Sequence, residues 1–320
     1  MKTISAVLDC DPGHDDVVAI LMAARHMDLV AVTTVAGNAS LENTTRNALM
    51  VVELFGVDVR VHAGADRPLL VANQYAETIH GTTGLDGPPH RPVTGMPGPA
   101  SAVERLLAFS RDVSAPWIVA TGPLTNVALA LRADPALAER LAGLSVMGGG
   151  LQFGNVTPAA EFNFWADPDA AAIVFDAGVP ITLCPLDLTH QLLVDRPFAE
   201  RVRSLGTEVA TFMAELFGEF IRRYDAVSAG APGGPMHDPC AVLALTHPEL
   251  FIFESLALAV VPGEGRGRGA VIVDRRNLTR RKPHNARVAT TIDADAAREL
   301  IYTAIAAVGR ATAPGAPDPT

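Results

Sequence analysis

Short apolar segments alternate with amphipathic segments along this chain, and this alternation limits the possible folds more than any other feature. The apolar segments have the length of buried strands, and the segments between them carry apolar residues at helical spacing. Strands are expected at residues 4–8, 29–35, 59–62, 117–120, 144–147 and 181–184, and helices at 16–26, 41–55, 124–132 and 169–177. This order predicts an α/β fold, in which a central, mostly parallel sheet is flanked by helices and the site lies at the C-terminal ends of the strands.

The C-terminal third continues the pattern without a linker or an internal repeat. It contains a long helical stretch at 197–224, strand-like segments at 256–261, 270–273 and 287–292, and a closing helix at 295–308. The chain has 320 residues, of which 49% are hydrophobic, so it can bury a substantial core. We therefore predict one α/β domain over residues 1–310 and a flexible C-terminal tail over residues 311–320.

The charge balance excludes several classes of partner. Twenty-five Lys and Arg against 35 Asp and Glu give a net charge of −10, and Lys2 and Lys282 are the only lysines. Such a chain is not expected to bind nucleic acid or an anionic membrane. No uncharged apolar run reaches the ~18 residues of a membrane span. The three cysteines are far apart, form no CxxC motif and indicate a reducing, cytoplasmic location.

An acidic cluster follows the first predicted strand. Residues 9–16 read Asp-Cys-Asp-Pro-Gly-His-Asp-Asp, which places four carboxylates at a strand end and a helix start. Any one of these aspartates could cap the helix, but four together raise one another's pKa unless a cation screens them. Oxygen ligands suit Ca²⁺ or Mg²⁺, so the cluster predicts a metal site. His14, inside the cluster, is expected to face outward at the start of the helix.

Further polar groups follow other predicted strands, and two segments interrupt the pattern. Taken singly, these polar groups have structural explanations, with Asn155 in a turn, Glu161 on the surface and Asp238 as a helix cap. The segments 81–99 and 226–235 are rich in Gly and Pro and adjoin His80 and His237. Because long irregular loops are often functional, we interpret both as lids, with plain surface loops as the alternative.

The motifs together resemble those of the nucleoside hydrolases of the inosine–uridine preferring group. Residues 9–16 are similar to the family signature DxDPGxDD, and the resemblance extends to about Asp293. The motifs that complete it, in order, are Asn38, residues 121–126, 147–150 and 161–163, and His237-Asp238-Pro239. The resemblance implies Ca²⁺-dependent hydrolysis of the N-glycosidic bond of ribonucleosides to free base and ribose, by a homodimer or homotetramer.

The resemblance also implies a role for each matching residue. Calcium would be held by carboxylates of Asp11, Asp16 and Asp238 and by the backbone carbonyl of Thr121. Asp11 would take a proton from the attacking water, and His237 would protonate the leaving base. The residues implied to contact the nucleoside are Asp15, Asn155, Glu161 and Asn163 at the ribose, Asn38 near the reacting sugar, His80 near the base, and Tyr224 as a candidate to stack on it. Trp165 departs from the family pattern and is interpreted as a packing residue.

The chemistry of these residue types agrees with such a reaction. Cleavage of an N-glycosidic bond develops positive charge on the sugar, which carboxylates stabilise, and a departing base benefits from a histidine donor. A haloacid-dehalogenase-type phosphatase also begins with Asp-x-Asp, but it needs a lysine that neither Lys2 nor Lys282 supplies. A non-catalytic ribose-binding protein would need neither Asp11 nor His237. The sequence leaves the preferred base undecided.

Overall fold

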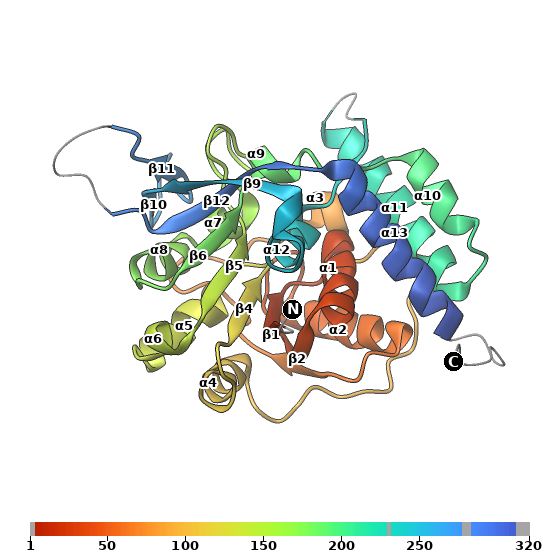
Figure 1. The fold of residues 1–320 in the computed structure, drawn as a ribbon, viewed down its shortest axis with the longest axis horizontal. Helices are drawn as coiled ribbons and strands as arrows, with labels where there is room; N and C mark the ends of the chain where they lie inside the picture. Colours follow the sequence, from red (N-terminus) through yellow and green to blue (C-terminus); the bar gives the residue numbers. More distant parts are fainter. Residues whose placement is uncertain (1–3, 229–231, 277–282, 312–320) are drawn as a thin grey trace.

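An eight-stranded sheet forms the centre of the computed structural model, which describes residues 4–228, 232–276 and 283–311 (Figure 1). The strands lie in the order β3-β2-β1-β4-β5-β6-β12-β9. All neighbours pair in parallel except β12 and β9, which are antiparallel. Their bounds are β1 (Ser5–Cys10), β2 (Asp28–Thr34), β3 (Arg60–Ala63), β4 (Trp117–Ala120), β5 (Gly143–Met147), β6 (Ile181–Cys184), β9 (Phe251–Leu256) and β12 (Ala286–Ile292). The predicted fold class is confirmed.

Helices cover both faces of this sheet. The first face packs against α1 (His14–His26), α2 (Leu41–Phe55) and α12 (His237–Thr246), and a further layer of α10 (Arg196–Arg203), α11 (Glu208–Val227) and α13 (Ala294–Ala311) packs on these helices and on one another. The second face packs against α4 (Ala102–Asp112), α5 (Thr125–Ala133) and α8 (Pro168–Asp176). In the central strand β1, Ala6 and Leu8 enter the first core and Val7 enters the second. A strand buried on both faces carries apolar residues on both, which is why Ala6, Val7 and Leu8 are apolar in succession.

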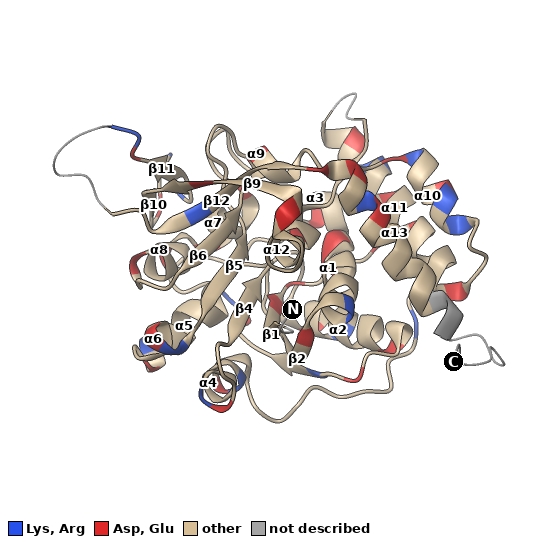
Figure 2. Cartoon of the chain, in the orientation of Figure 1, with Lys and Arg blue, Asp and Glu red and all other residues tan. Residues whose placement is uncertain are grey.

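Short elements complete the described chain. They are the helices α3 (Glu77–His80), α6 (Leu137–Arg140), α7 (Phe162–Ala166), α9 (Leu186–Thr189) and η1 (Pro248–Leu250), and the antiparallel pairs β7 (Leu193–Val194) with β8 (Gly234–Pro235) and β10 (Leu258–Val260) with β11 (Val271–Val273). Figure 2 shows basic and acidic residues interspersed on outer helices such as α4, α6 and α10. Among the described residues, no helix combines the length and the apolar character that a membrane crossing needs.

The structure corrects the predicted elements in three places. The helical stretch expected at 197–224 is interrupted between α10 and α11, where Gly206 has a φ of +69° and Thr207 caps the second helix. The strand expected at 256–261 is two strands, because the chain leaves β9 at Leu256 and enters the separate β10–β11 pair. Helix α4 was not predicted, although Ser101 and Glu104 form the capping box that signals its start.

The ends of the predicted loops and tail fall partly outside the described chain. Helix α13 continues to Ala311, the first residue of the predicted tail, and residues 312–320 lie outside the described residues. The loop expected at 81–99 contains no helix or strand. In the loop expected at 226–235, α11 extends to Val227 and β8 occupies Gly234–Pro235, while residues 229–231 lie outside the described part of the chain.

Candidate active site

A pocket of about 520 Å³ opens at the C-terminal ends of the parallel strands. In open α/β sheets this edge is where ligands bind, and the volume is in the range of small-molecule sites. All of the predicted site residues except Asp11 and Asp16 line it: Asp15, Asn38, His80, Thr121, Asn155, Glu161, Asn163, Tyr224, His237 and Asp238. The structure therefore gathers residues from distant parts of the sequence around one cavity.

Three buried carboxylates meet at one side of this pocket. Asp15 and Asp16 lie in the first turn of α1, and Asp238 lies in the first turn of α12, which packs against α1. One carboxylate oxygen from each of the three lies within 4.8 Å of the others. Burial, and then repulsion by Asp16, raises the pKa of Asp15 to about 7. Burial and the neighbouring carboxylates raise the pKa of Asp238 well above its usual range.

Asp11 lies beside this group with one oxygen unused. Its Oδ2 accepts a hydrogen bond from the backbone N–H of Asn38 at 2.7 Å, whereas its buried Oδ1 has no hydrogen-bond partner. A Cβ on Gly122 would lie 2.6 Å from Oδ1, and a Cβ on Gly37 would collide with Oδ2, so glycine is required on both sides. A buried carboxylate oxygen without a partner needs a proton or a cation. An all-oxygen donor set of this kind fits a hard divalent cation.

Thr121 and Asn163 connect the strand ends to the carboxylates. Thr121 follows β4, and its Oγ1 donates to Asp16 Oδ1 at 2.8 Å. The side-chain amide of Asn163 donates to the backbone carbonyl of Thr121 at 2.7 Å and to that of Met147 at 3.2 Å. Asn38 donates from its side chain to Asp16 Oδ2 at 3.2 Å. These bonds fix the carboxylates relative to the ends of β4 and β5.

Glu161 and Asn155 hold the helix that forms another wall. Glu161 is buried and caps α7, because its Oε1 accepts a hydrogen bond from the backbone N–H of Asn163 at 2.9 Å. Its Oε2 accepts from the backbone N–H of Gly149 at 2.7 Å, which ties the cap to the segment after β5. Burial raises the pKa of Glu161 to about 7. Asn155 is exposed, and its Oδ1 accepts from the backbone of Phe162 at 3.0 Å. Both side chains thus have structural tasks besides lining the pocket.

Imidazoles and aromatic rings also line the pocket. His237 begins α12, and its Nδ1 lies 2.7 Å from Thr189 Oγ1. The Tyr224 hydroxyl lies 3.0 Å from Nε2 of His190, whose ring centroid is 5.4 Å from that of His237. Burial lowers the pKa of His237 well below its usual range. The ring is therefore neutral at pH 7.

Several lining residues were missed by the sequence analysis. His190 lines the pocket just past α9, the short helix that follows β6, and the neighbouring Thr189 contacts His237 without lining the pocket itself. Phe220 lines the pocket from α11, where helical periodicity reports only its burial. Trp165, interpreted as a packing residue, is half-buried and also lines the pocket, with the Arg268 guanidinium stacked 4.1 Å from its ring centroid.

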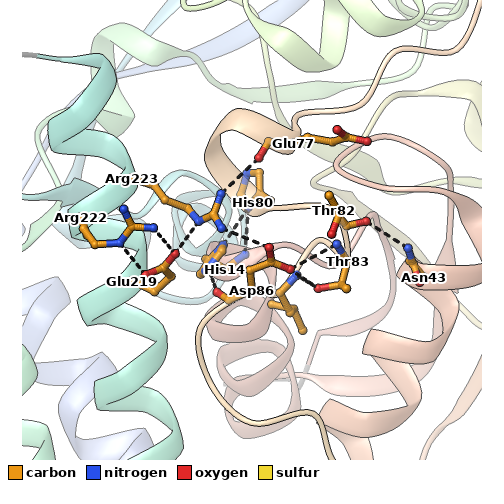
Figure 3. A network of polar contacts seen from close by, with 11 residues as sticks. His14, Asn43, Glu77, His80, Thr82, Thr83, Asp86, Glu219, Arg222 and Arg223 are labelled. Carbon is orange, nitrogen blue, oxygen red and sulfur yellow. Dashed lines mark hydrogen bonds and ion pairs between the residues drawn. The ribbon is translucent and has the colours of Figure 1, made fainter.

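The prediction for His14 is wrong. Its side chain is 1% exposed, because the segment that follows α3 folds over the start of α1 (Figure 3). Its Nε2 lies 2.9 Å from the backbone carbonyl of Asp86, and its Nδ1 lies 3.1 Å from Nδ1 of His80. His14 thus stands behind the pocket wall instead of facing solvent.

Known proteins resemble the chain over almost its whole length. The family model described as "Inosine-uridine preferring nucleoside hydrolase" matches residues 6–299. The pyrimidine-specific ribonucleoside hydrolase RihA of Enterobacter sp. (strain 638) is 42% identical over 282 residues, which cover 87% of this chain and 90% of that protein. RihA of Escherichia coli (strain K12) is 40% identical over 291 residues, covering 90% and 93%.

Solved structures have the same fold. The purine-preferring ribonucleoside hydrolase from Gardnerella vaginalis superposes with a TM-score of 0.90 at 29% identity, covering 96% of this chain and all of that one. The plant nucleoside hydrolase PpNRh1 superposes with a TM-score of 0.88 at 28% identity, covering 95% of this chain and 99% of that one.

Proposed function

Since the chain belongs to the inosine-uridine preferring nucleoside hydrolase family and is a ribonucleoside hydrolase, we propose that it is calcium-dependent and prefers pyrimidine ribonucleosides. The observation that carries the proposal is one pocket that is lined both by buried carboxylates and by His237. The pyrimidine preference is supported by the RihA relatives, which are named as pyrimidine-specific.

The residues present fit a calcium ion. We propose that Asp11, Asp16, Asp238 and the backbone carbonyl of Thr121 hold it. The partnerless Oδ1 of Asp11 and the close carboxylates of Asp16 and Asp238 support this set, and Asp15 lies within reach of the same group. A bound divalent cation supplies positive charge that makes a nearby water more acidic and binds vicinal sugar hydroxyls.

The chain's own residues then divide the reaction between them. Asp11 accepts a proton from the water that attacks the sugar carbon. Asp15 and Asn163 hydrogen-bond the ribose hydroxyls, with Asn38, Asn155 and Glu161 completing the ribose side. Because the developing sugar cation is positively charged, the buried carboxylates stabilise it more than they stabilise the neutral substrate.

The imidazole side assists the leaving base. Thr189 occupies Nδ1 of His237, which leaves Nε2 available to the nucleobase. Because the ring is neutral at pH 7, His237 acts as an N–H donor to the base as negative charge develops there. His80 lies near the base, and Tyr224 stacks on it.

A panel of ribonucleosides assayed for free ribose tests this proposal. Uridine and cytidine should be hydrolysed faster than inosine, and elemental analysis should find about one calcium per chain. Asp11→Ala should abolish turnover, whereas Asp58→Ala, a matched change at an exposed position, should not. Full activity after exhaustive chelation, or zinc in place of calcium, would contradict the metal. Binding without ribose release would indicate a non-catalytic nucleoside-binding protein instead.

The assembly and the location of the protein are separate predictions. We propose a homodimer or homotetramer, which light scattering coupled to size-exclusion chromatography tests. We also propose a cytoplasmic location, with which the three free, buried cysteines agree, and cell fractionation tests it.

A further inference from the structure

Two helices that are far apart in the sequence line one part of the pocket together. Helix α3 contributes Thr78, Ile79 and His80, and α11 contributes Phe220 and Tyr224. The two helices are in contact, and the ring centroids of His80 and Phe220 are 5.9 Å apart. The position of α3 on α11 therefore sets the spacing of the residues that the proposed function assigns to the nucleobase.

Arg223 joins these two helices through its guanidinium group. Its Nη1 donates to the backbone carbonyl of Glu77, the first residue of α3, at 3.3 Å, and its Nη2 donates to Oδ2 of Asp86 at 3.1 Å (Figure 3). Its Nε donates to Glu219 on α11 at 2.7 Å. Arg223 is not among the described residues that line the pocket. It therefore fastens both ends of the segment 77–86 to α11 without reaching the pocket.

Both partners of the link between the segment and α11 are largely shielded from solvent. The side chain of Arg223 is 18% exposed and that of Asp86 is 29% exposed. The other oxygen of Asp86, Oδ1, accepts from the backbone N–H and from the hydroxyl of Thr83, which fixes the carboxylate in its turn. A charge-assisted hydrogen bond between fixed and partly buried groups is stronger than one between exposed, mobile side chains.

The segment 77–86 is held independently by α2. Asn43 donates from its side chain to the backbone carbonyl of Thr82 at 3.2 Å, and Asn47 donates to that of Thr83 at 2.9 Å (Figure 3). These bonds do not involve α11. Loss of the guanidinium should therefore leave the segment attached to α2 and change its position relative to α11.

We propose that Arg223 is a positioning residue that fixes α3 against α11 and so keeps His80 and Tyr224 at the spacing that receives a base. Without the guanidinium, only a fraction of the molecules has this spacing at any time, and the affinity for a ligand that carries a base falls by that fraction. A sugar without a base does not depend on this spacing. The proposal rests on the proposed function, because it concerns the base that the same pocket takes.

Two adjacent arginines provide a matched pair of variants. Arg223→Met keeps the aliphatic part of the side chain and should raise the KM for uridine about tenfold, whereas the inhibition constant of free ribose should change less than about twofold. Arg222 donates to the same Glu219 at 2.6 Å, and among the described residues its bonds go to Glu219 alone. Either variant leaves Glu219 paired with the other arginine, so Arg222→Met should keep both constants at their wild-type values.

Asp86→Asn breaks the same link from its other end. Because the donors of Thr83 keep Oδ1 in its place, the new amide NH₂ faces Arg223 and cannot accept its hydrogen bond. This variant should raise the KM for uridine by a smaller factor, since Arg223 retains the carbonyl of Glu77. Adding Asp86→Asn to Arg223→Met should have little further effect, because both changes remove one interaction.

Amide hydrogen exchange gives a readout that needs no turnover. The amides of His80, Gly81, Gly84 and Asp86 bond to carbonyls at positions 76–81, and they should exchange about tenfold faster in Arg223→Met than in the wild type or in Arg222→Met. Unchanged exchange would overturn the proposal. A merely structural role would lower the active fraction without a selective rise in the KM for uridine, and that result would overturn it too. If the wild-type chain releases no ribose from any nucleoside, the proposed function fails, and the exchange rates still decide whether Arg223 fixes α3 to α11.

Discussion

Chelation of divalent cations should make the free energy of unfolding fall as the pH rises, because the buried aspartates then lack a counter-charge. Burial raises the pKa of Asp15 from 3.8 to about 7. Between these pH values the folded chain keeps a proton that the unfolded chain has lost, so stability decreases with pH. The difference corresponds to about 4 kcal/mol at about 1.4 kcal/mol per pH unit. That is a large part of the roughly 5–15 kcal/mol that stabilises a typical domain.

Urea unfolding at several pH values between 5 and 8, with EDTA or with calcium, measures this effect. In EDTA, Asp15→Asn removes the titrating group and should reduce the slope by about 1.4 kcal/mol per pH unit below pH 7. Asp58→Asn, an exposed control, should keep the wild-type slope. Calcium should flatten the wild-type profile, because it stabilises the ionised carboxylates of the folded state. Identical slopes for wild type and Asp15→Asn in EDTA would refute the reasoning.

Three further predictions concern the base, the sugar and the pocket wall. His237→Ala should slow uridine hydrolysis by ~10²-fold more than it slows p-nitrophenyl riboside hydrolysis, whose leaving group departs without a donor; equal losses with calcium still bound would remove His237 from the mechanism. Because buried groups that bind the 2′-hydroxyl would be left unpaired, kcat/KM for deoxyuridine should be ~10⁴-fold below that for uridine, and comparable values would contradict ribose chelation. Arg268→Ala removes the stack on Trp165 and a 2.8 Å hydrogen bond to its carbonyl, so it should lower the unfolding free energy by about 1–3 kcal/mol and change the tryptophan fluorescence; an unchanged emission spectrum and midpoint would show that the contact contributes nothing.

The strand ends were predictable because their signals are local. An apolar run followed by Asp9 and Asp11 indicates a buried strand that ends at polar groups, and the structure has β1 there. The meeting of Asp238 with Asp15 and Asp16 is not local, since α12 packs on α1 across more than half of the chain. Spacing alone could not predict that contact, and only the family resemblance did.

The errors arose where tertiary contacts decide the environment of a residue. His14 is buried by the segment after α3, which is an irregular loop. Such a loop lacks the apolar periodicity from which helices and strands are predicted, so its position over His14 could not be predicted. Gly206 ends one helix and Thr207 caps the next, but the apolar spacing continues across the break and hid it. Strand β9 is partly exposed at the sheet edge, so it lacks the apolar run that identified the buried strands.

The place of β12 between β6 and β9 has a consequence for biosynthesis. Asp238 is translated 222 positions after Asp16, so at typical elongation rates the first carboxylates wait on the order of tens of seconds for Asp238. Strand β12 is translated later still. The fully buried strand β6 ends at Cys184 and its partner β12 begins only at Ala286, so β6 has no partner on one edge for roughly 5–20 s of synthesis. An open apolar edge pairs readily with other chains, so ribosome-bound or truncated chains that stop before Ala286 should depend on chaperones to stay unaggregated.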